Sequence, residues 1–264
     1  MIPAQLEYVR ATSLEEALDA IAQPDAKAIA GGQSLIPVLK LRIARPKRVV
    51  DIERIGLDQI EQREGELAVG ALVTWDRLSR AEEVARPALA ALVDCARHVG
   101  DLQVRNRGTI GGSLVHADPA SDLPAVVLAL GARLVLRSRD GERTVDANEF
   151  LVGPFTTALA PGELLSEIVL PVPERRSGSA YVKVEHPASG FALAGAAALV
   201  AADGGRRVAV TGVAARATLL PEDGSVEGLE VYGDRFAPEP YRRHLAGVVT
   251  RRALELAASR TEDR

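Results

Sequence analysis

The sequence has 264 residues, is 47% hydrophobic and 26% charged, and carries a formal net charge of −4. This length suits about two domains with a buried core, and the mild acidity gives no electrostatic reason to expect nucleic acid. A single cysteine, Cys95, excludes a disulfide framework and any Cys-ligated iron–sulfur or zinc site within the chain.

The first elements alternate between helix and strand. Ser13 and Glu16 have the spacing of a capping box and predict a helix start. A short buried strand is expected at Lys27–Ala30, a helix at Leu35–Ile43 and a second strand at Val49–Asp51. This alternation predicts a small α/β unit over about residues 1–55.

A second region, residues 56–173, mixes strands and helices. The patterns predict strands at Glu66–Val73, Ala132–Arg137 and Glu163–Leu170 and helices at Pro87–Val99 and Pro124–Leu130. The Pro87–Val99 helix places Cys95 at an apolar position, where we expect a small buried hydrophobe and not a nucleophile.

The remaining residues predict a separate C-terminal unit, residues 179–264. Pro171–Ser179 has the proline, charge and small residues of an interdomain linker. Three strands are expected after it, followed by a closing helix, at Ala180–Glu185, Ala192–Ala202, Arg206–Val213 and Glu239–Ser259. The longest apolar run, Leu193–Ala202, is far shorter than the roughly 18 residues of a membrane span, and no signal segment is visible, so we expect a cytoplasmic protein.

Two glycine pairs are the clearest candidates for binding chemistry. We expect both to be loops, and we call Ala30–Ser34 the first glycine motif and Thr109–Ser113 the second glycine motif. A glycine pair lets the backbone approach a ligand and turn N–H groups towards an anion. One such pair alone is more often a simple turn, but two suggest a long phosphate-containing ligand. Because neither is G-x-G-x-x-G or a Walker sequence, NAD in a Rossmann fold and P-loop phosphotransfer are both disfavoured.

The residues around these motifs resemble a known family. AGGQSLIPVLKLR (30–42) and QVRNRGTIGGSLVHADPASDLPA (103–125) are similar to the FAD-binding medium subunit of the molybdenum hydroxylases, which include aerobic carbon monoxide dehydrogenase and the split bacterial xanthine dehydrogenases. The resemblance runs almost end to end. It implies an α+β fold, namely a two-subdomain FAD-binding domain (residues 1–173) of the p-cresol methylhydroxylase/xanthine dehydrogenase type. A small C-terminal domain of three antiparallel strands plus helices would follow.

The resemblance also implies the residues that contact the cofactor. The two motifs would hold the pyrophosphate and ribityl atoms, Asp122 would bond polar groups, and Leu165, Lys183 and Phe191 would lie at the isoalloxazine. Relatives can attach the flavin through a histidine in the first motif; Gln33 stands there, so non-covalent FAD is expected. The complete implied set is Ala30, Gly31, Gly32, Gln33, Ser34, Leu35, Thr109, Ile110, Gly111, Gly112, Ser113, Asp122, Leu165, Lys183 and Phe191.

Several of these residues have a purely structural alternative. Asp122 could be an N-cap, Lys183 a solvated strand residue and Phe191 plain core. His116 is interpreted as a loop residue that orders the second glycine motif. Arg105 and Arg107, not among the implied contacts, could offset phosphate charge or flank a strand on its solvated side.

The implied function is that of a redox subunit. A large molybdenum-cofactor subunit would oxidise the substrate, and a small subunit with [2Fe–2S] clusters would pass electrons to this chain's FAD, within a dimer of heterotrimers. No catalytic acid–base group and no metal site are expected in this chain. The alternatives are a self-sufficient flavoenzyme and a structural subunit that has lost its flavin.

Two segments depart from the family pattern. Glu185–Phe191 replaces a basic stretch that ends in Gly-Asp-Tyr, which alters the outer surface of the predicted flavin site. Ala214–Pro240 is short and rich in Pro, Gly and acidic residues where the family has an alanine-rich helix. We therefore expect a trimmed C-terminal domain.

Overall fold

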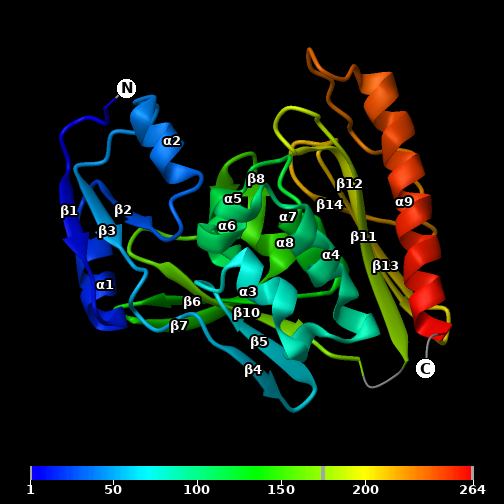
Figure 1. The fold of residues 1–264 in the computed structure, drawn as a ribbon, viewed down its shortest axis with the longest axis horizontal. Coiled ribbons are helices and arrows are strands. Elements are labelled where there is room, and N and C mark those ends of the chain that lie inside the picture. Colours follow the sequence, from blue (N-terminus) through cyan, green and yellow to red (C-terminus); the bar gives the residue numbers. More distant parts are fainter. Residues whose placement is uncertain (1, 174–175, 263–264) are drawn as a thin grey trace.

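The structure is a computed structural model that describes residues 2–173 and 176–262. The described residues form three larger sheets and a two-stranded one, and the larger sheets follow one another from the N-terminal to the C-terminal part of the chain (Figure 1). The first sheet is parallel, with the order β1 (Glu7–Arg10), β3 (Arg48–Asp51) and β2 (Ala26–Ile29). Helices α1 (Leu14–Ile21) and α2 (Leu35–Lys40) complete the predicted α/β unit.

Helix α1 begins where the capping box predicts. The Ser13 hydroxyl accepts a hydrogen bond from the N–H of Glu16. In the usual capping box the Glu16 carboxylate would accept from the N–H of the N-cap residue, Ser13. Here it accepts from the N–H and hydroxyl of Thr12, one residue earlier, at 2.8 and 2.9 Å. These hydrogen bonds lower the pKa of the Glu16 carboxyl.

The second sheet is antiparallel and has five strands. Their order is β4 (Ile60–Arg63), β5 (Glu66–Gly70), β10 (Leu164–Pro171), β6 (Arg133–Ser138) and β7 (Gly141–Asp146). The central position of β10 joins residues about a hundred positions apart, as in the pair Glu167–Gly70. Both edge strands, β4 and β7, escaped sequence prediction because their side chains are mostly polar and exposed.

Short helices cover this sheet and connect it to the rest of the chain. They are α3 (Trp75–Arg80), α4 (Ala90–His98), α5 (Leu102–Arg107), α6 (Ile110–His116), α7 (Leu123–Ala129) and α8 (Ala147–Phe150). Single 3₁₀ turns lie at Glu82–Val84 and Pro87–Leu89. A small hairpin pairs β8 (Leu151–Gly153) with β9 (Thr156–Thr157). Figure 1 places α5 and α6 between α2 and the C-terminal sheet.

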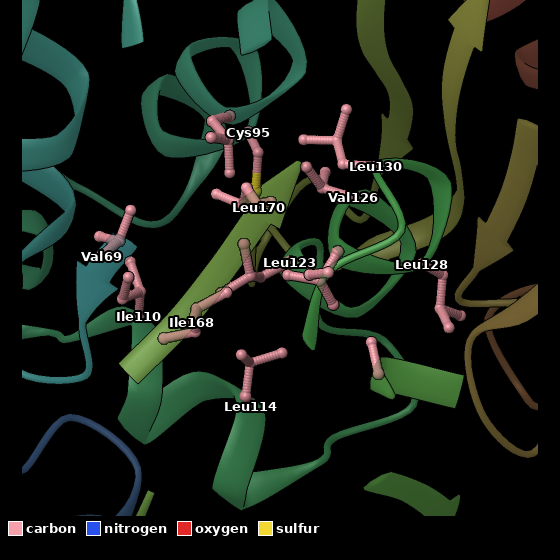
Figure 2. Close-up of a cluster of buried hydrophobic side chains, with 14 of the residues drawn as sticks. Val69, Cys95, Ile110, Leu114, Leu123, Val126, Leu128, Leu130, Ile168 and Leu170 are labelled. Atoms are coloured by element: carbon pink, nitrogen blue, oxygen red, sulfur yellow. The ribbon is translucent and has the colours of Figure 1, made fainter. Parts of the chain in front are cut away.

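The main hydrophobic core lies between the second sheet and these helices. Figure 2 shows Cys95 of α4 beside Leu170 of β10 and Val126 of α7. Cys95 is completely buried, and burial raises the pKa of its thiol well above the ordinary value. The predicted role of Cys95 as a small core residue is confirmed.

The C-terminal sheet is antiparallel and contains the three predicted strands and one more. Its order is β11 (Ser177–Glu185), β12 (Ala192–Ala201), β13 (Arg206–Thr211) and β14 (Thr218–Leu220). The long helix α9 (Glu239–Glu262) covers one face (Figure 1). Successive side chains of β12 lie on opposite faces of the sheet. Ala196 packs towards α9, and Ala197 belongs to the main core.

Two segments of the C-terminal unit, the stretch before α9 and the predicted linker, can be compared with the structure. In the fully described stretch between β14 and α9 there is no further helix or strand, and the trimming of this domain relative to the family stays a prediction. Ser177–Ser179 belong to β11, so the predicted linker is shorter than Pro171–Ser179. Residues 174 and 175 of that linker lie outside the described residues, and the domain boundaries 1–173 and 179–264 stay a prediction.

No helix among residues 2–173 and 176–262 combines the length and the apolar character needed to cross a membrane.

Candidate cofactor site

The first glycine motif is an open turn between β2 and α2. Gly32 has a φ of 75°, a conformation that residues other than glycine adopt only with strain. Within the described residues, the backbone N–H groups from Gly31 to Ser34 donate no hydrogen bond. The Ser34 hydroxyl makes no capping bond to α2 either. The motif therefore presents several hydrogen-bond donors that an anionic group could use.

The second glycine motif differs from the prediction. It is not a loop but the start of α6, with Thr109 as the N-cap and its hydroxyl accepting from the N–H of Gly112 at 3.2 Å. The N–H of Ile110 donates to Val73, and that of Gly111 donates to Ala71. The expectation that this glycine pair turns free N–H groups towards an anion is wrong, because the protein itself uses these donors.

Gly111 allows the second motif to pack closely against the chain that follows β5. A Cβ at this position would lie 2.6 Å from the carbonyl oxygen of Ala71, closer than atoms can pack. Gly111 is buried, whereas Gly112 is exposed. Gly111 therefore permits close packing of α6 on the chain that follows β5, and only Gly112 and Ser113 remain on the accessible side.

The tertiary structure brings the two motifs together. A Cβ on Gly31 would lie 2.6 Å from the carbonyl carbon of Arg107 and 2.9 Å from the Cα of Gly108. The first motif thus rests directly on the backbone that leads into the second. Their proximity, which a single ligand held by both would need, is a property of the fold.

The two arginines before the second motif have other partners. They lie on helix α5 and not beside a strand. Arg105 donates to the carbonyls of Val99 and Gly100, and Arg107 forms an ion pair with Glu53. Both side chains therefore have partners within the protein.

Asp122 is the centre of a buried polar network. Its carboxylate accepts from the Tyr181 hydroxyl at 2.5 Å and from the Lys183 ammonium at 2.9 Å. The Asp122 and Lys183 side chains are 6% and 1% exposed. Burial raises the pKa of the Asp122 carboxyl, and the Lys183 charge acts in the opposite direction.

This network decides two of the alternatives. Asp122 occupies the N-cap position of α7, but its side chain makes no capping bond there and is used in the buried network instead. Lys183 is not solvated, so that alternative is wrong. Ser113 of the second motif reaches the same segment, because its hydroxyl lies 2.8 Å from that of Ser121.

Tyr181 is a member of this network that sequence reasoning missed. It is buried, and burial raises the pKa of its phenol well above the ordinary value. A Cβ on Gly195 would lie 3.1 Å from the Tyr181 Cζ, so a glycine on the neighbouring strand makes space for the ring. The available signal was its position two residues before Lys183 on a predicted strand, which puts both side chains on one face.

The remaining predicted residues lie in different environments. Phe191 is 47% exposed, so its interpretation as core is wrong. Leu165 of β10 is buried in the main core. His116 is the last residue of α6 rather than a loop residue, and its ring lies 5.3 Å from that of Phe155. The Lys183 ammonium also bonds the carbonyl of Gly190, and so joins the Asp122 network to the residue before Phe191.

Other regions offer less for a cofactor. One hollow of about 360 Å³ lies between α9 and the chain after β14, and its lining includes Asp223 and Thr250. None of the residues predicted to contact the cofactor lines it. Among the described residues, no group of His, Cys, Asp and Glu side chains could hold a metal ion.

These features define a class of protein. An α+β unit, followed by an antiparallel sheet under a long helix, is the fold of the FAD-binding subunits of molybdenum dehydrogenases. Residues 4–173 match the family described as "FAD binding domain in molybdopterin dehydrogenase". The chain belongs to this family.

Individual relatives are similar over the whole chain. The carbon monoxide dehydrogenase medium chain of Afipia carboxidovorans is 33% identical, with 100% of each chain covered. The caffeine dehydrogenase subunit beta of Pseudomonas sp. (strain CBB1) is 36% identical, over 98% of this chain and 97% of that one. A structure of carbon monoxide dehydrogenase from Hydrogenophaga pseudoflava superposes with a TM-score of 0.92 and 34% identity, over 98% and 99% of the two chains.

Proposed function

We propose that this oxidoreductase subunit binds FAD non-covalently and passes electrons from the [2Fe–2S] clusters of a small partner subunit to an external acceptor. A large partner subunit with the molybdenum cofactor would oxidise the substrate, and the three chains would form a dimer of heterotrimers. The observation that carries the proposal is the first glycine motif, whose N–H groups have no partner in the part of the chain that the structure describes and which is held against the second motif.

The residues present fit a dinucleotide. The N–H groups of Gly31 to Ser34 would donate to the pyrophosphate. Gly112 and Ser113 leave room for ligand atoms at the second motif, and Phe191 exposes an aromatic ring that could contact the flavin. When bound, FAD supplies the redox chemistry, and this chain supplies its binding and orientation.

Gln33 supports non-covalent binding. Its exposed amide is not a nucleophile that could form a bond to the flavin, and its Nε2 lies 3.5 Å from the carbonyl oxygen of Gly31. Acid or heat precipitation should therefore release all yellow colour into the supernatant, where chromatography identifies FAD and not FMN. Colour that stays with the pellet contradicts this part of the proposal, and a colourless protein that takes up no added FAD contradicts flavin binding.

A second experiment tests the subunit role. The isolated chain should be silent towards purines, aldehydes, N-heterocycles and carbon monoxide, yet be reduced by dithionite and reoxidised by an artificial acceptor. Expressed with the genes beside its own, it should copurify with a molybdenum subunit and an iron–sulfur subunit. Turnover of any of these substrates by the chain alone would favour a self-sufficient flavoenzyme instead.

A further inference from the structure

The Lys183 ammonium group has all of its donors engaged inside the protein. It donates to the carbonyl of His98 at 2.9 Å, to Asp122 Oδ2 at 2.9 Å and to the carbonyl of Gly190 at 2.6 Å. An ammonium group has three N–H donors. The Glu185 carboxylate lies further away, at 3.8 Å, and is largely exposed. No donor of Lys183 is left for a cofactor.

Accessibility leads to the same conclusion. The Lys183 side chain is only 1% exposed, so a ligand cannot lie against it. The residue as a whole is half-buried, which means that its accessible part is the main chain. A cofactor could touch Lys183 through the backbone of β11, but not through the charged group.

The three acceptors belong to three separate segments. His98 ends α4, Asp122 precedes α7, and Gly190 lies in the turn between β11 and β12. One buried cation therefore fastens this turn to the segment that follows the second glycine motif.

The turn positions Phe191. Gly190 has a φ of 71°, and its N–H donates to the carbonyl of His186, whose own N–H donates to the carbonyl of Phe191. The His186 ring packs edge-on against Phe236 at 4.5 Å. The Lys183 hydrogen bond holds the carbonyl of Gly190, the residue immediately before Phe191. The Phe191 side chain is half exposed.

We propose that Lys183 is a positioning residue, which holds Phe191 at a fixed place relative to Asp122 and thereby sets the environment of the flavin ring. This inference rests on the proposed function, because Phe191 matters only if a flavin lies beside it. It assigns Lys183 a role through the Gly190 carbonyl and not through a contact of its ammonium with the cofactor.

The test compares Lys183→Met with Lys27→Met, a change of an exposed lysine that also lies on a strand. Backbone hydrogen exchange of peptides covering residues 186–192, measured without added flavin, should rise about tenfold in Lys183→Met and stay unchanged in Lys27→Met. Unchanged exchange in Lys183→Met would overturn the inference. This measurement does not depend on the cofactor, so it separates a failed tether from a failure of FAD binding.

A double-mutant cycle then tests whether the effect reaches the flavin through Phe191. With FAD bound, Lys183→Met should shift the flavin absorption spectrum and midpoint potential, and the shift should largely vanish in the Phe191→Ala background. An equal shift in both backgrounds would mean that Lys183 acts without Phe191. If Lys183→Met does not fold, the double variant Lys183→Met/Asp122→Asn removes both buried charges. Hydrogen exchange of residues 186–192 is then measured in that variant.

Discussion

The two glycine motifs have similar sequences but use their glycines differently. The first is an open turn, in which the N–H groups from Gly31 to Ser34 donate no hydrogen bond within the described residues. The second is a helix start, in which Gly111 is buried against Ala71 and the N–H groups of Ile110, Gly111 and Gly112 are used. A glycine pair thus indicates that the backbone closely approaches another group. Whether that is a ligand or the protein itself depends on the surrounding fold.

The largest expected effect concerns the fold at the second motif. Gly111→Val should lower the free energy of unfolding by about 3 kcal/mol or more, because the new side chain has no space beside Ala71. Urea denaturation of the flavin-free protein measures it. Gly112→Ala is the control and should cost about 1 kcal/mol or less, since an added Cβ meets only the Thr109 hydroxyl. Equal losses in the two variants would contradict the packing role of Gly111.

Gly31 should link the two motifs. In Gly31→Ala the new Cβ would meet the backbone of Arg107 and Gly108, so the motifs must separate. We expect FAD affinity to fall by about a hundredfold, which corresponds to about 2.7 kcal/mol, and equilibrium titration with FAD measures it. Gly153→Ala, where no atom lies within 4 Å of the added Cβ, should bind FAD like the parent protein. Undiminished affinity in Gly31→Ala would show that the apposition is not needed for binding.

Gly32 has a control with the same backbone conformation. The φ values of Gly32 and Gly65 are 75° and 70°, and Gly65 lies in the β4–β5 turn. Alanine at either position should cost about 1–2 kcal/mol of stability through the left-handed backbone. Only Gly32→Ala should also weaken FAD binding, by about tenfold. A similar FAD affinity in both variants would mean that the first motif does not contact the cofactor.

The smallest effects concern two hydroxyl groups. Ser34→Ala should leave the unfolding free energy unchanged, because this hydroxyl makes no capping bond, and should weaken FAD binding by several-fold through one lost hydrogen bond. Thr109→Val removes the N-cap of α6 and should cost about 1 kcal/mol of stability. Thermal unfolding and FAD titration of both variants distinguish the roles, and a stability loss in Ser34→Ala would count against a free hydroxyl.

Local sequence patterns predicted much of the fold, and the elements that they missed have identifiable causes. The capping box placed α1, the apolar runs placed β3, β10 and β12, and the predicted closing helix agrees with α9 within a few residues. The edge strands β4 and β7 were missed because exposed polar side chains carry no periodic signal. The second motif was expected as a loop because a glycine pair is typical of backbone that approaches a ligand, whereas the structure packs Gly111 of α6 against Ala71.

The sequence by itself determined the local elements and, through its resemblance to a family, the class of cofactor. Only the tertiary structure decided which N–H groups remain free, that Lys183 meets Asp122 across 61 positions and that Tyr181 joins them. The physical reason is the range of the interactions. Helix caps and apolar periodicity act over a few neighbouring residues, whereas the partners of a buried charge are set by distant segments that the packed core brings together.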